Sequence, residues 1–249
     1  MGSRAAWRDL HAAFIKNLRP TRAWGIYMIY QLIRYGSDLS FIKLIFMFMS
    51  YALIILLALP VHELAHAYTA YRLGDNTAKW NGRLTLNPFA HLDIIGTILI
   101  FVFGFGYAKP VPVNPRNFRN YKTGMLLTSL AGPLSNLVMG FLSLAILRLL
   151  SFFALPVTMY GVLYLLLDTF VYINIVLAVF NLLPIPPLDG FRIVANFLPD
   201  RWSYFVDRYH WYISMALFLL IASDVFGGVI SGIANPVYNL FYKILGFSV

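Results

Sequence analysis

The chain has 249 residues, of which 60% are hydrophobic and only 12% charged, and its mean hydropathy is +0.72. Soluble domains use about 45–50% apolar residues, so this composition excludes an ordinary soluble domain and predicts an integral membrane protein. The absence of cysteine excludes disulfides and thiolate metal ligands. The formal net charge of +9 suits anionic lipid headgroups better than nucleic acid, for which the sequence has no motif.

Residues 1–40 mix basic and aromatic side chains and contain no uncharged run long enough to span a bilayer. They also lack the order of regions that is typical of a signal peptide. We expect a basic, amphipathic interfacial segment here. It is followed by one domain of residues 41–249, with its core motifs in 62–192 and C-terminal helices in 209–246.

A long helix is predicted from Phe41 to about Leu73, with Gly74 as its stop. It contains an uncharged stretch of eighteen residues, Leu44 to Val61, followed directly by the motif His-Glu-Leu-Ala-His at 62–66. On a helix, the two histidines share one face and can reach one metal ion, while Glu63 can act on a water molecule there. This pattern is typical of a zinc hydrolase, and its position predicts chemistry within the membrane.

Two shorter elements are expected after this helix. Asn81-Gly82 is a strong signal for a tight turn and predicts a small β-hairpin over Asn81–Leu86, beside the site. Ile94 to Ala108 is uncharged but short for a span, and its three glycines disfavour a straight helix. The proline-rich stretch that follows it is expected to be extended.

Further spans are predicted at Thr123–Leu147, bent at Gly132-Pro133, and at roughly Val157–Leu183. The apolar stretches 209–223 and 225–242 fit either two short helices or one broken hairpin. The predicted fold class is therefore an all-α polytopic membrane protein, a multi-span helical bundle with a small β-hairpin and a reentrant segment.

A catalytic zinc ion generally has three protein ligands, so a carboxylate is needed beside His62 and His66. The candidates in or next to apolar segments are Asp93, Asp168, Asp189 and Asp224. Asp189 is favoured because prolines end the preceding helix and Gly190 permits close approach to the metal. The predicted cofactor is one Zn²⁺ per chain.

These motifs together resemble the site-2 protease family of intramembrane zinc metalloproteases, in its compact branch without PDZ or CBS domains. The resemblance rests on the histidine motif and on Asn-x-x-Pro-x-Pro-x-Leu-Asp-Gly at 181–190, with further matches at 74–75, 82–88, 91–93, 108–115 and 131–136. At Ile94 the chain departs from the family, which usually has proline there. The resemblance implies that Asn181 holds the substrate backbone or the developing oxyanion, although a capping or interhelical hydrogen bond is the alternative. His91 and Asn136 are weaker candidates, since each could order the site or simply bond within its loop or between helices.

The two metal-binding motifs lie at the C-terminal ends of their helices, so these helices must run in the same direction. One crossing, 123–147, satisfies this requirement, and Ile94–Ala108 is therefore predicted to enter the membrane and return. The distribution of basic loops predicts a cell-membrane protein with its site towards the cytoplasm, which leaves the side of residues 1–40 open.

The predicted activity is hydrolysis of peptide bonds within or near transmembrane segments of membrane proteins, as in regulated intramembrane proteolysis, with Glu63 as the base. Glu63 is the only glutamate in the chain, so a metalloprotease class with glutamate as third ligand is excluded. A zinc-binding pseudoprotease without turnover remains the alternative. A metal transporter is disfavoured because only one ligand cluster is evident. By analogy with the family, the last two apolar segments form a lateral gate.

Overall fold

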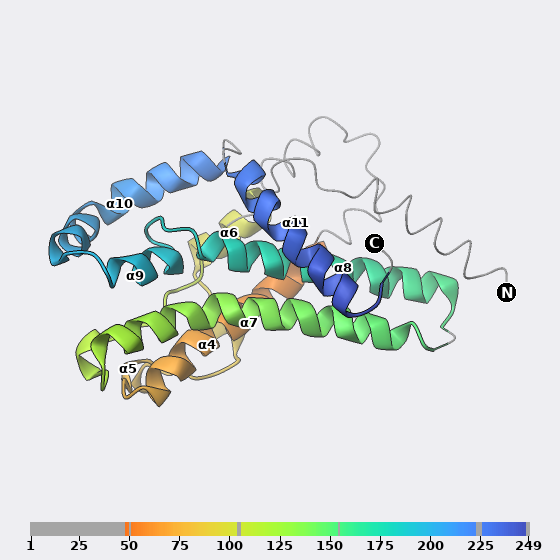
Figure 1. Cartoon of the computed structure of the whole chain (residues 1–249), viewed down its shortest axis with the longest axis horizontal. Coiled ribbons are helices and arrows are strands. Elements are labelled where there is room, and N and C mark those ends of the chain that lie inside the picture. Colours follow the sequence, from red (N-terminus) through yellow and green to blue (C-terminus); the bar gives the residue numbers. More distant parts are fainter. Residues whose placement is uncertain (1–47, 50, 104–105, 154, 223–225, 248–249) are drawn as a thin grey trace.

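The computed structural model describes residues 48–49, 51–103, 106–153, 155–222 and 226–247, so the predicted interfacial segment 1–40 lies outside it. The described residues are mostly helical and contain no strand beyond one isolated bridge (Figure 1). Three of their helices are long and apolar enough to cross a membrane: Tyr51–Arg72, Tyr121–Leu150 and Met159–Asn181. The three long spans predicted from the sequence are thus helices: the ends of the last two are shifted by a few residues, and the predicted start of the first, Phe41, lies outside the described residues.

The helix with the two histidines contains a π-helical turn, η1 (Ile54–Ala58), directly before α4 (Leu59–Arg72). Pro60 lies in the first turn of α4 and cannot donate a backbone hydrogen bond. In the wider π turn, the Leu59 N–H instead reaches the carbonyl of Ile54, which accommodates the proline without ending the helix. Gly74 then ends α4 with a φ of 113°, as the sequence predicts.

The predicted β-hairpin at Asn81–Leu86 is wrong. The residues before it form the short helix α5 (Thr77–Trp80), and Gly82, with a φ of 68°, ends that helix. The Gly82 N–H donates to Lys79 O at 3.0 Å and the Arg83 N–H to Ala78 O at 2.9 Å, which is the hydrogen-bond pattern of a glycine-terminated helix. Asn-Gly is favoured wherever the backbone needs a positive φ, so it marks a helix end as readily as a hairpin.

The loop around α5 is anchored by the buried carboxylate of Asp75. It accepts hydrogen bonds from the backbone of Thr77 at 3.0 Å, the backbone of Asn114 at 2.7 Å and the side chain of Asn117 at 2.8 Å. Burial alone would raise the pKa of Asp75, but these hydrogen bonds outweigh it and lower the pKa below its usual value. The carboxylate therefore joins the two loops that surround the end of α4.

The segment after Asp93 forms a helix, α6 (Ile94–Phe103), and then returns to its starting point. Leu92 pairs with Ala108 in an antiparallel bridge, and the Lys109 N–H donates to His91 O at 2.8 Å. A Cβ on Gly96 would lie only 2.0 Å from the carbonyl oxygen of Tyr107, so glycine is required where the two limbs meet. The two ends lie side by side, as a reentrant segment requires, while its depth in a bilayer remains a prediction.

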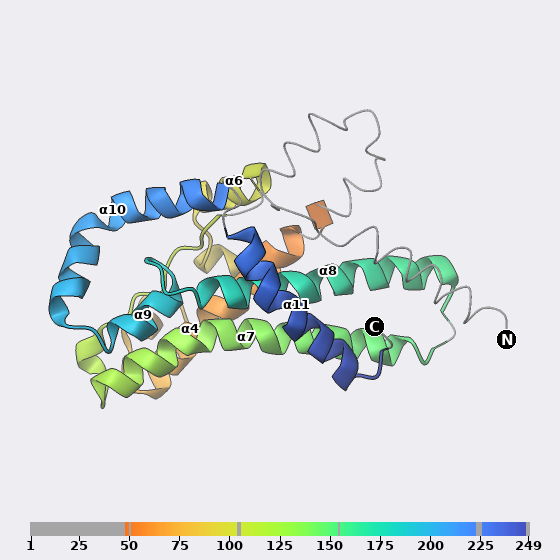
Figure 2. The same ribbon diagram turned by 45° about the horizontal axis from the view of Figure 1, so that its top comes forward.

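The remaining helices build the bundle around α7 (Tyr121–Leu150), which packs against both α4 and α8 (Val157–Asn181) and runs antiparallel to both (Figures 1 and 2). They are followed by α9 (Asp189–Ala195), α10 (Asp200–Ala222) and α11 (Gly227–Ile244). The last two are separate helices, and α10 begins earlier than the sequence predicts. In both views α11 crosses α7 and α8, while α10 lies on the other side of α8 from α4.

Candidate metal centre

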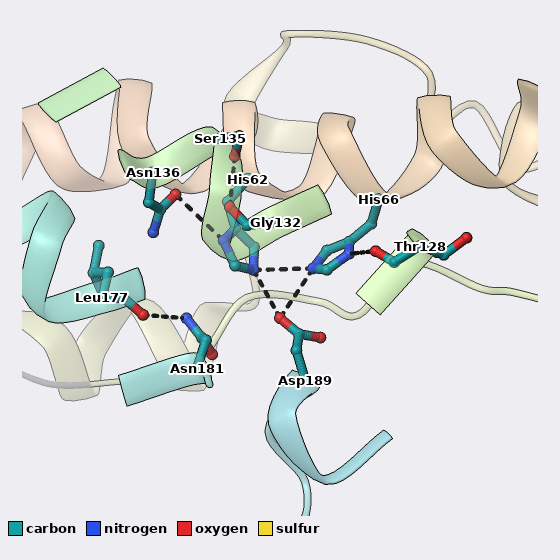
Figure 3. Close-up of polar contacts among 9 residues, drawn as sticks. All are labelled: His62, His66, Thr128, Gly132, Ser135, Asn136, Leu177, Asn181 and Asp189. Carbon is teal, nitrogen blue, oxygen red and sulfur yellow. Dashed lines mark hydrogen bonds and ion pairs between the residues drawn. The ribbon is translucent and has the colours of Figure 1, made fainter. Parts of the chain in front are cut away.

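The two histidines of α4 face the centre of the bundle side by side. The rings of His62 and His66 are buried, with centroids 4.7 Å apart and planes at 82° to each other. Their four-residue spacing on one helix accounts for this pairing. Both Nε2 atoms point towards the beginning of α9 (Figure 3).

Asp189, the first residue of α9, completes a triangle of potential ligand atoms. Its Oδ2 lies 3.3 Å from His62 Nε2 and 3.1 Å from His66 Nε2, and the two Nε2 atoms are 3.0 Å apart. Zinc bonds of about 2.0–2.2 Å at tetrahedral angles require ligand atoms about 3.3 Å apart. The triangle therefore has the size that one zinc ion needs.

The other ring nitrogens fix which atoms of the histidines carry hydrogen. His66 Nδ1 lies 2.6 Å from the backbone carbonyl of Thr128, which can only accept, so Nδ1 must donate. His62 Nδ1 lies 3.3 Å from Asn136 Oδ1, which is likewise an acceptor. In the neutral rings, both Nε2 atoms then carry lone pairs, and three acceptors converge on one point. That arrangement is repulsive unless a cation lies between them, so the chemistry of the side chains fits a metal ion.

Asp189 is ionised in this environment. Burial by itself would raise the pKa of its carboxyl group, but when His62 and His66 carry protons in place of a metal ion, their hydrogen bonds and positive charge lower the pKa well below its usual range. An ionised carboxylate is the form that binds a metal ion.

Space for the imidazoles comes from Gly132 on α7. A Cβ at this position would lie 2.3 Å from His66 Nε2 and 2.6 Å from His62 Nε2. From the sequence, Gly132-Pro133 is expected only to bend the helix. The close approach of α7 to the two rings is the further reason for glycine here.

Gly190 also acts differently from the sequence interpretation. A Cβ on Gly190 would lie 2.2 Å from the carbonyl oxygen of Leu182 and 2.5 Å from that of Leu183. Glycine therefore lets α9 approach the C-terminal end of α8, a packing role that the sequence interpretation did not include. This contact brings the neighbouring Asp189 to the histidines.

Glu63 follows His62 on α4, and its side chain is buried. No hydrogen bond to its carboxylate is found among the residues that the structure describes. Its oxygens are thus not committed to a structural partner there.

The three weaker candidates for the site, Asn136, Asn181 and His91, have different hydrogen-bond partners. Asn136 orients His62, as described, and is buried. Asn181 ends α8 on the side of Asp189, and its Nδ2 donates to Leu177 O at 3.0 Å within its own helix (Figure 3). His91 is buried, its Nε2 donates to Thr85 O at 2.8 Å within the loop, and it is not one of the residues whose potential ligand atoms cluster.

The carboxylates that the sequence analysis leaves out have other partners or lie outside the description. Asp93 accepts a hydrogen bond from Gly96 N at 2.9 Å at the start of α6. Asp168 accepts hydrogen bonds from the hydroxyl groups of Tyr238, at 2.6 Å, and Tyr242. Asp224 lies outside the described residues. The backbone carbonyl of Thr128 is the contact that sequence reasoning missed, because a main-chain acceptor leaves no signal in the sequence.

A buried cluster of two histidines and a carboxylate, in a bundle whose main helices are of membrane-spanning length, defines a class of membrane metalloprotein. Comparison with known sequences agrees. The profile described as "Peptidase family M50" matches residues 155–221, which include Asp189 but not the two histidines.

Individual relatives match a longer part of the chain than this profile does. "Putative zinc metalloprotease YwhC" of Bacillus subtilis (strain 168) is 48% identical over 149 residues, which are 58% of this chain and 67% of the relative. Rip2 of Mycobacterium tuberculosis, described in the same words, is 36% identical over 147 residues, 57% of this chain and 55% of the relative. The chain belongs to peptidase family M50, the site-2 protease family, and is a membrane protein.

A more distant relative is also named a zinc metalloprotease. "Zinc metalloprotease MJ0392" of Methanocaldococcus jannaschii is 26% identical over 152 residues, 61% of this chain and 35% of the relative. The matched region thus spans from two thirds to about a third of these relatives' lengths. No solved structure matches the chain.

Proposed function

We propose that this protein is an intramembrane zinc metalloprotease that hydrolyses peptide bonds within or near transmembrane segments of membrane proteins. The observation that carries the proposal is the triangle of His62, His66 and Asp189 acceptors, 3.0–3.3 Å apart, inside helices of spanning length. The names of the relatives support zinc as the ion.

His62, His66 and Asp189 would hold one zinc ion per chain. When bound, zinc polarises a scissile carbonyl and lowers the pKa of water from 15.7 to about 7. Asn136 and the Thr128 carbonyl keep the two imidazoles in the tautomer that presents Nε2 to the ion. The bundle excludes bulk water from all three ligands, which are buried.

Glu63 is the general base of the proposed reaction. Its carboxylate takes a proton from the attacking water and delivers it to the nitrogen of the departing amine, so that it ends each cycle ionised. The lack of a structural partner among the described residues favours this role. It is the only glutamate in the chain, so no other glutamate can take this role.

Asn181 is proposed to bind the substrate carbonyl as negative charge develops on it. One of its two amide hydrogens is used by Leu177 O, and the second is available to a substrate oxygen. Replacing Asn181 with alanine should lower kcat by about a hundredfold with unchanged zinc content. A variant with wild-type kcat would remove Asn181 from the mechanism.

The substrate must be unwound where it is cut, because a helix hides its peptide carbonyls in its own hydrogen bonds. Membrane-held regulators that another protease has already shortened fit this requirement. The exposed basic residues of the loops at the site end support a cytoplasmic position of the site by the positive-inside rule: Arg72, Lys79, Lys109, Arg116, Arg119 and Lys122.

The deciding experiment compares purified wild type with Glu63→Ala, in liposomes, on a panel of single-span substrates. Wild type should cut, whereas the variant should keep about one zinc per chain and lose cleavage by at least about a thousandfold. If both proteins bind zinc and neither cuts any substrate, the alternative of a zinc-binding membrane protein without turnover is favoured. If Glu63→Ala still cuts, another residue is the base.

A further inference from the structure

Arg83 is an arginine buried in the loop after α5, with only 4% of its surface exposed. Its Nη2 donates to the backbone carbonyl of Lys109. Its Nε, also buried, has no hydrogen-bond partner in the described part of the chain. Burying a guanidinium group is costly unless a negative charge lies near it.

The packing of the loop places it against α4. Leu84, next to Arg83, packs in a small cluster with Ala67 of α4 and with Ala78 and Val111. Ala67 lies one helical turn after Glu63, so the two residues share one face of α4. The loop of Arg83 therefore covers the face of α4 from which Glu63 projects.

The electrostatics agree with this packing. Burial lowers the pKa of the Arg83 guanidinium, and the negative charge of Glu63 acts in the opposite direction and raises it. Glu63 and Arg83 are 9% and 4% exposed, so water screens their interaction poorly.

Arg83 is not needed simply to close the loop. His91 already bonds Thr85 O at 2.8 Å, the Lys109 N–H bonds His91 O at 2.8 Å, and the cluster around Ala67 packs beneath them. The single hydrogen bond from Arg83 to Lys109 adds to a loop that is fixed by neutral contacts. What Arg83 alone contributes is a buried positive charge.

We propose that Arg83 is a positioning residue for Glu63, and that its buried positive charge draws the Glu63 carboxylate towards the loop side of α4 and away from direct ligation of the metal ion. The proposal rests on the proposed role of Glu63. A carboxylate drawn to that side is free to hydrogen-bond a water molecule or another bound group instead of becoming a fourth ligand. No hydrogen bond between the two side chains is required, because the charge acts over distance.

A double-mutant cycle tests the proposal without any cleavage. The probe is acetohydroxamate, which chelates zinc and donates a hydrogen bond to a neighbouring carboxylate, and its Kd is measured on the zinc-loaded full chain in detergent. Arg83→Met should weaken binding about five- to twentyfold when Glu63 is present and have no effect in the Glu63→Ala background. Arg83→Lys, which keeps the charge, should recover most of the affinity.

The matched control is His91→Ala, which disturbs the same loop without changing its charge, so its effect should be the same in both Glu63 backgrounds. Equal effects of Arg83→Met in both backgrounds, or an equal loss in Arg83→Lys, would overturn the proposal in favour of a structural role. If Arg83→Met does not fold with about one zinc per chain, Arg83→Gln takes its place in the cycle. Because the cycle needs zinc but no turnover, a failure of the protease proposal would show separately, as hydroxamate binding without cleavage of any substrate.

Discussion

At the scale of single residues, the candidate site depends on the neighbouring groups that set the tautomer and the position of its two histidines. Two histidines one helical turn apart bind a metal ion only if both Nε2 atoms carry lone pairs, and the acceptors at Thr128 and Asn136 enforce this state. Gly132 contributes by having no side chain, because any Cβ would occupy the space of both rings. Helix α7 therefore contributes three features to the centre: the Thr128 carbonyl, the Asn136 amide and the absence of a side chain at Gly132.

Gly132→Ala should abolish metal binding, because its Cβ would lie 2.3 Å from His66 Nε2 and the imidazole cannot stay in place. We expect zinc content to fall from about one to less than about a tenth of an ion per chain, measured by elemental analysis of purified protein. Gly161→Ala is the matched control, since a Cβ on Gly161 of α8 meets nothing within 4 Å. Full zinc content in Gly132→Ala would contradict the packing of α7 against the histidines.

At the scale of elements, α8 has two ends with different tasks. Its C-terminal end leads through residues 182–188 to Asp189, while its middle carries Asp168, which faces α11. The Asp168 carboxylate accepts hydrogen bonds from Tyr238 and Tyr242, and the Tyr242 hydroxyl also lies 3.0 Å from that of Tyr164. A buried cluster of Leu144, Val171 and Ala234 surrounds this network. Asp168 thus fixes α11 to the part of the bundle that does not hold the metal site.

Asp168→Ala should loosen α11 without emptying the metal site. Leaving the hydroxyl groups of buried Tyr242 and half-buried Tyr238 without this acceptor costs about 2 kcal/mol, which corresponds to a decrease in Tm of about 4–8 °C for a chain of this size. The measurement is thermal unfolding in detergent, together with zinc content. Tyr172→Phe is the control, because it removes one hydroxyl bond of 3.3 Å to Asn235 between the same two helices and should shift Tm by less than about 3 °C. Equal shifts in both variants would mean that Asp168 has no special role in holding α11.

At the scale of the whole molecule, the position of α6 decides how the chain is threaded. α4 and α8 run in the same direction, and α7 packs against both and runs antiparallel to them (Figure 1). The bridge between Leu92 and Ala108 returns the chain to where α6 began, so that α7 can start on the side where α4 ends. The ends of α4 and α8 that carry the ligands therefore meet on the same side of the bundle.

Cysteine labelling can test this threading directly, because the natural chain has no cysteine. Single cysteines at Asp93 and Lys109 should react with an impermeant maleimide from the same side of the membrane. A cysteine at Phe152, which is 72% exposed between α7 and α8, should react only from the opposite side. Labelling of positions 93 and 109 from opposite sides would mean that α6 crosses the membrane.

The sequence by itself determined the class of protein, the three long apolar helices and the choice of His62, Glu63, His66 and Asp189 as candidates. These features depend on composition and on spacing along one helix, which are local properties. The tertiary structure decided that Asn81-Gly82 ends a helix, that Gly190 serves the contact with α8, and which atoms hold the imidazoles. The local sequence indicates only that a residue tolerates a positive φ or has no side chain. Which element packs against that residue depends on helices that are distant in the sequence, so only the tertiary packing determines the structural role of the glycine.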